Sequence, residues 1–442
     1  MPEERTTPNS DSVPQAGQTA PESRTQKTFS RIWLVILYGF VAIAFTAVWL
    51  WVYDWLNTAI WSNDFVTSHA WTIPLGILFF SLLVGLAQKY LRAPTVIGGG
   101  FTELLRERDQ AQRASSTFAG ALLSSFCSLL SGASVGPEGP LAFLIQDITA
   151  WLNEKLKVAE DTGFGLTVAA LASAFNGIVG SPVFTAVFAT EFQVGGTELS
   201  FAFLAWNLLA GAIGYLFFTL LHLPVFAQYI PFTPISILTL PYVAYAILLG
   251  LLGSLLAIFI GACFQFFGTV MAKFGDRVVL RTLVAGVIIA VVVTFVPQVM
   301  FAGARQIFPM INDPARYGVW LLLLFALLKI LLLALAFKSG YLGGPIFPTL
   351  FAATMVALAL HVLFPSVPLS ILVLCIESAA VGLLLGAPLT AILLVAVVGT
   401  YNPYSIALMC LSTAVAMFVG AGFRQLMAQR TARKAVAPAQ EE

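Results

Sequence analysis

Between a polar beginning and a polar end, the chain is a series of apolar runs separated by short breaks. The runs cover residues 32–53, 70–88, 117–131, 141–152, 164–175, 199–221, 237–271, 283–301, 318–337, 349–364, 369–399 and 404–423. A helix needs about 20 apolar residues to cross a bilayer, and only some of the runs are that long. Many breaks carry Gly and Pro rather than charges, and irregular backbone is tolerated at membrane depth only inside protein or beside water. The pattern predicts an all-α polytopic membrane protein of the transporter or channel kind.

The two ends of the chain differ from the part between them. Residues 1–30 are rich in Ser, Thr, Gln and Pro, which predicts a disordered tail, and 425–442 form a second polar tail. We expect residues 31–424 to form the transmembrane domain. Basic residues flank both ends of this domain, so the positive-inside tendency places both termini in the cytoplasm and the domain in the cell (inner) membrane.

Composition supports this class and excludes others. Of 442 residues, 59% are hydrophobic and 10% are charged, with a net charge of +1 and a mean hydropathy of +0.91. Soluble proteins carry about 25% charged residues, so a water-soluble fold is excluded. The near-neutral charge gives no support to nucleic-acid binding. Four scattered cysteines and three scattered histidines have no metal-ligand spacing, so we expect no metal and no cofactor.

Two stretches of the chain align without a gap. Residues 131–143 read S-G-A-S-V-G-P-E-G-P-L-A-F and residues 339–351 read S-G-Y-L-G-G-P-I-F-P-T-L-F, at an offset of 208 residues. A second pair follows in the same order, with G-S-P-V-F-T-A beginning at Gly180 and G-A-P-L-T-A at Gly386. Two matches in one order at similar spacing indicate two homologous halves, approximately 90–220 and 300–420.

The repeated motifs have the residue types of an anion site. Each motif ends a loop and begins an apolar helix, and proline fits the first turn because no N–H is needed there. Free N–H groups at a helix start carry about half a positive charge and favour an anion. If the halves are inverted, both helix starts meet near the bilayer midplane. The structural residues of the two motifs are Pro137, Pro140, Gly343, Gly344, Pro345 and Pro348.

The two copies differ at one position that carries chemistry. Glu138 in the first copy matches Ile346 in the second. An ionisable residue within a membrane is a functional candidate by default. Its carboxylate can occupy the anion site as a tethered competitor, and protonation would free the site. The alternative is a glutamate that only caps its own helix.

These residues resemble the CLC family of chloride channels and chloride/proton antiporters. G-P-E-G-P at 136–140 looks like that family's motif around its gating glutamate, and G-G-P-I-F-P at 343–348 looks like its second motif. T-V-I-G-G-G-F-T-E at 95–103 occupies the place of a third. The resemblance implies a homodimer, with one pathway per subunit built from two inverted halves of short, tilted helices. It implies that Glu138 is the gate and proton carrier and that the anion is bound by Gly99, Gly100, Gly136, Gly139, Ile346, Phe347 and Tyr404.

Some positions depart from that family's pattern. Its anion-coordinating serine falls on Gly99, which leaves the preferred anion open between chloride and fluoride, nitrate or a small organic acid. Its internal proton-relay glutamate falls one residue after Glu191, which leaves the choice between channel and proton antiporter open. We expect Asp147, Lys329 and Glu377 to be helix-end or paired residues rather than residues of the pathway. An intramembrane enzyme is the competing class, but no H-E-x-x-H motif occurs, and we do not expect an enzyme.

Overall fold

The computed structural model describes residues 24–95, 117–191, 201–223, 225, 230, 232–399 and 402–436. Within these residues every regular element is a helix, apart from one isolated β-bridge. The helices are α1 (Arg24–Trp61), α2 (Asp64–Ser68), α3 (Thr72–Tyr90), α5 (Phe118–Leu130), α6 (Glu138–Lys155), α7 (Glu160–Val179), α8 (Phe184–Glu191), α9 (Phe201–Leu220), α10 (Leu240–Ala272), α11 (Val278–Phe295), the 3₁₀ turn η3 (Pro297–Val299), α12 (Phe308–Asn312), α13 (Pro314–Ser339), α14 (Ile346–Leu363), α15 (Leu369–Leu385), α16 (Pro388–Val398) and α17 (Pro403–Val436).

In the described part of the chain, nine helices are long and apolar enough to cross a membrane. Three shorter apolar helices, α5, α15 and α16, lie among them. The outer surface is strongly apolar, with Trp320, Leu240 and Phe295 all at least 80% exposed. Such a surface has its natural solvent in lipid. The prediction of an all-α polytopic membrane protein is confirmed.

The structure defines the helix boundaries in two long apolar runs and at both ends of the membrane domain. The run at 369–399 is two helices, because Gly386 has φ +69° and ends α15, and Pro388 begins α16. The run at 237–271 is a single helix, α10. The stretch expected to be a disordered tail contains the start of α1 at Arg24, and α17 continues to Val436. Adding residues to an existing helix costs little, which explains both extensions.

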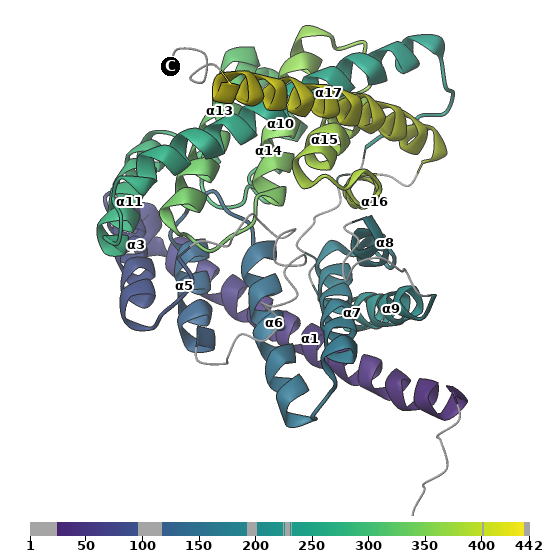
Figure 1. The fold of residues 1–442 in the computed structure, drawn as a ribbon. Coiled ribbons are helices and arrows are strands. Elements are labelled where there is room, and N and C mark those ends of the chain that lie inside the picture. Colours follow the sequence, from purple (N-terminus) through teal and green to yellow (C-terminus); the bar gives the residue numbers. More distant parts are fainter. Residues whose placement is uncertain are drawn as a thin grey trace, which may run out of the picture.

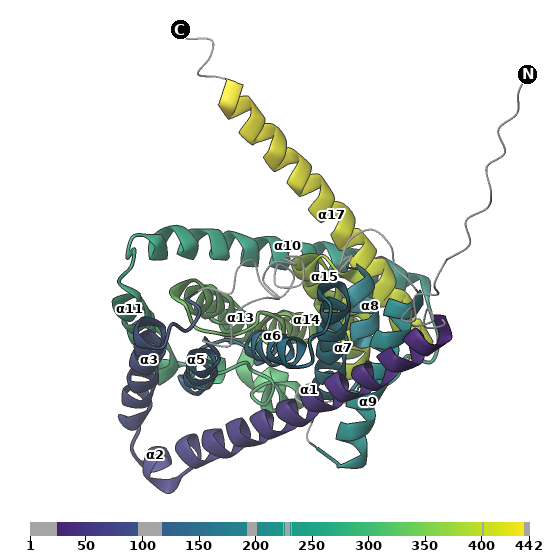
Figure 2. The ribbon, with the colours of Figure 1, turned by 60° about the horizontal axis from the view of Figure 1, so that its bottom comes forward.

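The two halves lie against each other. In Figure 1 the purple-to-teal helices of the first half occupy the lower part of the molecule, and the green-to-yellow helices of the second half occupy the upper part. α7 packs against α1 and α9, while α10 packs against α15 and α17. Figure 2 shows α1 running obliquely along one side and the end of α17 projecting beyond the bundle. Helices α7, α14 and α15 are largely buried by their neighbours.

Backbone conformation repeats between the halves. Gly132 and Gly340, which are 208 residues apart, both have positive φ, of +73° and +99°. Gly180 and Gly386 do so as well, at +73° and +69°, where each ends a helix. A left-handed conformation is strained for other residues, so the matched glycines mark matched turns. The α5–α6 turn therefore corresponds to the α13–α14 turn, and α7–α8 corresponds to α15–α16.

Candidate functional site

The two repeated motifs meet in the centre of the protein. The N–H of Gly136 donates to the carbonyl of Gly344, and the N–H of Gly344 donates to the carbonyl of Gly136, both at 2.9 Å. This antiparallel bridge pairs each glycine with its own counterpart in the other repeat. A local two-fold axis therefore passes between the two loops, as expected for inverted halves.

A helix starts immediately after each loop. Pro137 precedes α6 and Pro345 precedes α14, while Pro140 and Pro348 are the third residues of these helices. Proline in the first turn removes no intrahelical hydrogen bond, because those N–H groups have no partner within the helix. The remaining N–H groups of the first turns are thus available to an acceptor.

The carboxylate of Glu138 takes up one of those groups. Its Oε1 accepts a hydrogen bond of 2.7 Å from the N–H of Ile346, the first residue of α14. Glu138 is 2% exposed, and its Oε2 has no hydrogen-bond partner among the described residues. An acid of the first half therefore lies at a helix start of the second half.

Glycines make the space for this carboxylate. A Cβ added to Gly136 would lie 1.9 Å from Glu138 Oε2, and one added to Gly344 would lie 2.2 Å from Glu138 Cδ. A Cβ on Gly139 would lie 2.5 Å from the carbonyl oxygen of Gly343. Any larger residue at these positions would displace the acid or separate the loops.

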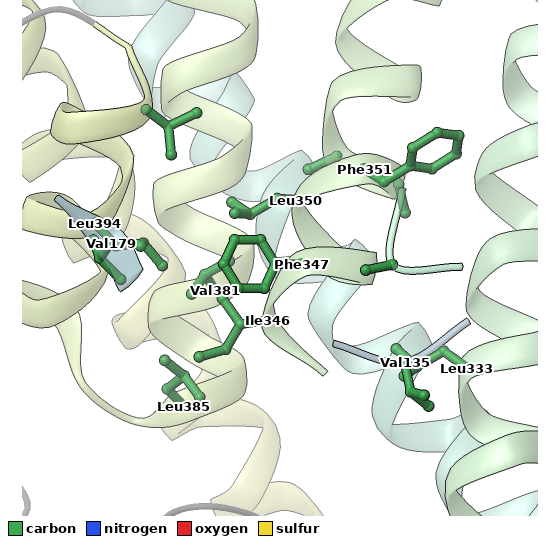
Figure 3. Packing of buried hydrophobic residues seen from close by; sticks show 14 of the residues in the cluster. Val135, Val179, Leu333, Ile346, Phe347, Leu350, Phe351, Val381, Leu385 and Leu394 are labelled. Atoms are coloured by element: carbon green, nitrogen blue, oxygen red, sulfur yellow. The ribbon is translucent and has the colours of Figure 1, made fainter. Parts of the chain in front are cut away.

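The surroundings of the carboxylate are apolar. Figure 3 shows Ile346 and Phe347 packed near Val381 and Leu385 of α15, with Val135 on the other side. No lysine or arginine of the described residues forms an ion pair with Glu138. The site therefore attracts negative charge with N–H groups and a helix dipole, without a fixed cation.

A buried lysine supports the loop before Glu138 from behind. Lys329 in α13 donates to the carbonyl oxygens of Val299 at 3.0 Å, Met300 at 3.3 Å and Phe301 at 2.5 Å. The segment 299–301 in turn holds the loop, because Ser134 Oγ donates to the Val299 oxygen and Phe301 N–H donates to the Gly132 oxygen. The lysine fixes one wall of the site through this segment.

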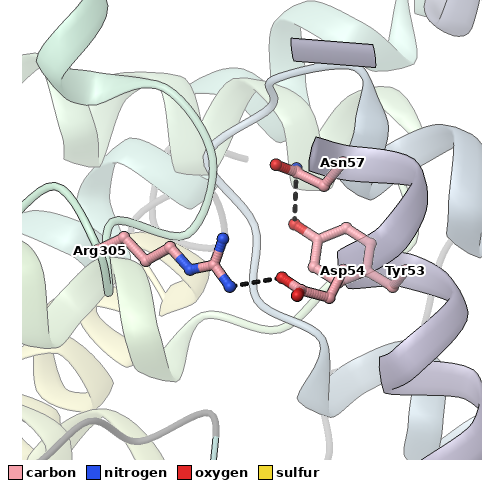
Figure 4. Close-up of polar contacts among 4 residues, drawn as sticks. All are labelled: Tyr53, Asp54, Asn57 and Arg305. Atoms are coloured by element: carbon pink, nitrogen blue, oxygen red, sulfur yellow. Dashed lines mark hydrogen bonds and ion pairs between the residues drawn. The ribbon is translucent and has the colours of Figure 1, made fainter. Parts of the chain in front are cut away.

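A pocket of about 440 Å³ lies at the end of α1, and Met300, Phe301 and Trp61 are part of its lining. The indole of Trp61 donates to the carbonyl of Leu130, at the end of α5. Asp54 and Arg305 form an ion pair at this pocket, and Asn57 donates to the Tyr53 hydroxyl beside it (Figure 4). Phe301 lines the pocket and donates its N–H to Gly132, in the loop that leads to Glu138.

The structure brings together most of the predicted site residues, but not all. Gly136, Gly139, Ile346 and Phe347 surround Glu138, whereas Gly99 and Gly100 lie outside the described residues. Tyr404 lies at the start of α17 and is 41% exposed, with its N–H on the Asn402 side chain.

Glu191 also lies apart from these residues, at the end of α8. Its carboxylate accepts from the N–H groups of Leu389 and Thr390, at 2.6 and 2.7 Å. It therefore caps α16.

Lys329 and Glu377 are paired residues within helices, but their partners are not ions of opposite charge. Both are fully buried inside helices, and neither forms an ion pair within the described residues. The reason is that backbone carbonyls and a hydroxyl serve as their partners. Hydrophobic patterning carries no signal for such partners, since they come from distant segments.

Other chemistry finds no support at this site. G-A-S-V-G at 132–136 has the form of a serine-nucleophile motif, but Ser134 is fully buried and its Oγ donates to a carbonyl. The described residues contain no group of three or more His, Cys, Asp or Glu side chains arranged to hold a metal. The arrangement offers helix-start N–H groups to an acceptor, and the carboxylate of Glu138 already contacts one of them.

Helices of this kind, with two helix starts meeting at a buried acid, define a class of membrane transport proteins, and comparisons place the chain within it. The model of the voltage gated chloride channel family matches residues 80–421. The chain therefore belongs to the voltage gated chloride channel (CLC) family and is an integral membrane protein.

Similar sequences and structures agree with this family. The "Putative ion-transport protein YfeO" of Salmonella newport (strain SL254) is 25% identical over 278 residues, which is 61% of this chain and 64% of that protein. The protein of the same name from Salmonella agona (strain SL483) has the same values. The match thus spans less than two thirds of these relatives' length.

Two solved structures share the fold, each with a TM-score of 0.72 and 18% identity. One is a CLC-type fluoride/proton antiporter, with 90% of this chain and 97% of that chain covered. The other is a slow cyanobacterial Cl⁻/H⁺ antiporter, with 91% and 97% covered. The prediction of a CLC-like fold with inverted repeats is confirmed.

Proposed function

We propose that this protein transports a small anion, chloride by default, through the site at the start of α14, with Glu138 as its gate. The observation that carries the proposal is the contact between the Glu138 carboxylate and the Ile346 N–H. A carboxylate and a free anion need the same donor, so only one can occupy it at a time. Protonation removes the negative charge of Glu138 and weakens its hold on the helix start.

The sign of the pH effect follows from this competition. As pH falls, more Glu138 is neutral, so anion flux rises. Flux measured in liposomes should therefore increase at acid pH in the wild-type protein, whereas Glu138→Gln should lose the part of this dependence that comes from Glu138. Glu154→Gln is the control, because that residue is exposed at the end of α6. If Glu138→Gln left the flux and its pH dependence unchanged, the gate would be refuted.

The same vesicles distinguish a channel from a proton-coupled antiporter. Proton movement is measured alongside chloride, bromide, nitrate and fluoride flux. In an antiporter the reversal potential follows both the pH gradient and the anion gradient, while in a channel it follows the anion alone. The rank order of the anions identifies the substrate, since fluoride, nitrate or an organic acid is the alternative to chloride.

We further propose a homodimer in the cytoplasmic membrane with both termini in the cytoplasm. Tyr38, nearer the start of α1, donates to Asn153 near the end of α6, at 2.7 Å. Lys155 and Lys157 follow there, so the basic end of α6 lies toward the N-terminal end of α1.

Light scattering of the purified protein in detergent measures the subunit number, and a monomeric mass would contradict the dimer.

A further inference from the structure

A second acid lies in the membrane core, and gating by Glu138 does not use it. Glu377 is in the middle of α15 and is 1% exposed. Its Oε1 lies 2.5 Å from the hydroxyl of Thr354 in α14. Its Oε2 is buried and has no hydrogen-bond partner among the described residues.

The hydrogen bonds of the Thr354 hydroxyl bear on whether Glu377 is protonated. The hydroxyl oxygen of Thr354 is 2.9 Å from the carbonyl oxygen of Leu350 and 2.5 Å from Glu377. A hydroxyl has one proton, and a backbone carbonyl only accepts. If Glu377 is protonated and donates to Thr354 while Thr354 donates to Leu350, each contact has a proton of its own; with an ionised Glu377 the single Thr354 proton would have to serve both acceptors.

On the described helices that pack closely against α15, no Lys or Arg occurs before Arg424 near the end of α17. Helices α10, α14, α16 and α17 pack against α15, and α10, α14 and α16 contain no Asp, Glu, Lys or Arg. The other titratable groups on these helices are Tyr242, Tyr245, Cys263, His361, Tyr404 and Cys410, with basic residues of α17 from Arg424 onward. The ring of His361 is directed to the carbonyl of Val367, at 3.2 Å. An ionised Glu377 would therefore be an isolated buried charge.

The acid is close to the anion site in terms of helix geometry. Thr354 follows Ile346 by eight residues, which is about 12 Å along α14. Val381, one turn after Glu377 on α15, packs near Ile346 in Figure 3. Two negative charges at about 12 Å in protein repel each other enough to change affinity about tenfold.

We propose that Glu377 is a proton-binding site linked to the anion site at the start of α14, so that the protein takes up a proton at Glu377 as it binds an anion. This inference rests on the proposed function of that anion site. In the step, the carboxylate of Glu377 accepts one proton from a hydronium ion of the bulk solution: an O–H bond of hydronium breaks and releases water, and a new O–H bond forms on the carboxylate. By linkage, an anion binds more tightly when Glu377 is neutral, and an anion bound at α14 favours the neutral acid.

The test removes the other acid first. In the purified Glu138→Gln protein, chloride binding is measured by calorimetry over a range of pH. The chloride dissociation constant should rise about tenfold as Glu377 ionises at high pH. In the protein carrying both Glu138→Gln and Glu377→Gln this rise should disappear. The amide of glutamine still donates to Thr354, so the second substitution keeps the hydrogen bonds.

A matched control and a second measurement separate the outcomes. Glu138→Gln with Glu154→Gln should keep the tenfold rise. The infrared C=O stretch of a protonated carboxyl should be present in Glu138→Gln, decline as pH rises, and be missing after Glu377→Gln. An unchanged rise after Glu377→Gln, or no such band, would overturn the proposal. If Glu138→Gln bound no chloride at any pH, the anion site itself would fail, and the infrared band would decide whether Glu377 carries a proton.

Discussion

The space around the Glu138 carboxylate depends on hydrogen atoms in place of Cβ atoms. Gly344→Ala would put a Cβ 2.2 Å from Glu138 Cδ, so the carboxylate must leave the Ile346 N–H. Losing a charge-assisted hydrogen bond should lower the free energy of unfolding by about 2 kcal/mol. In a Glu138→Ala background the same change should cost much less, because no carboxylate remains to be displaced.

Unfolding of the four proteins in detergent measures this coupling. Gly261→Ala is the control, since no atom lies within 4 Å of a Cβ added there. Equal costs of Gly344→Ala in both backgrounds would mean that Gly344 does not shape the position of the acid.

Lys329 contributes to stability through hydrogen bonds to backbone carbonyl oxygens. Lys329→Met would leave the carbonyl oxygens of Met300 and Phe301 without their donor, whereas that of Val299 keeps the Ser134 hydroxyl. At about 1 kcal/mol or more for each unsatisfied group, the free energy of unfolding should fall by at least about 2 kcal/mol. Thermal unfolding in detergent measures the loss. Lys338→Met, in the last turn of the same helix and only half-buried, should cost less than about 1 kcal/mol.

At the scale of elements, the side chain of Glu191 at the end of α8 caps the start of α16. Both oxygens of Glu191 receive N–H groups from the start of α16, and Thr390 Oγ1 also donates to Oε2, at 2.6 Å. A capping carboxylate at a helix start contributes about 1 kcal/mol. We therefore expect Glu191→Ala to lower stability by about that amount.

Glu191→Gln separates a cap from a proton relay. If Glu191 only caps α16, anion flux and any accompanying proton flux should remain within about twofold of the wild-type protein, because glutamine still presents one acceptor oxygen. Both fluxes are measured in the same liposomes. A selective loss of proton flux would instead assign the relay to Glu191.

The elements differ in how far the sequence predicts them. The starts of α6 and α14 follow from repeated Gly-Pro motifs, and their pairing follows from the repeat, since 136 and 344 are matched positions. The break between α15 and α16 could have been predicted, because Gly386 and Pro388 interrupt the apolar run. The partners of Lys329 and Glu377 could not be predicted, because they depend on which distant segments come together. Patterning reports burial and period but gives no such contacts.

At the scale of the whole molecule, the two ends of α1 define two sides of the membrane domain. Asn63, Leu130 and Arg305 lie by the end of α1, whereas Asn153 contacts Tyr38, nearer its beginning. With the N-terminus in the cytoplasm, a cysteine at Asn63→Cys should react with a membrane-impermeant maleimide added outside whole cells. Lys157→Cys should react only after the membrane is permeabilised. The reverse pattern would invert the proposed orientation.

The bridge between Gly136 and Gly344 has a mechanical consequence. Two backbone hydrogen bonds join the loops of the two repeats. Neither loop can therefore move alone without breaking them, so the two loops move together. The inexpensive motion at this centre is rotation of a single side chain about its own bonds. Under the proposed function, the backbone around the anion site stays nearly rigid and only the Glu138 side chain rotates. The rate at which the site becomes free for an anion would then be set by the rate of that rotation.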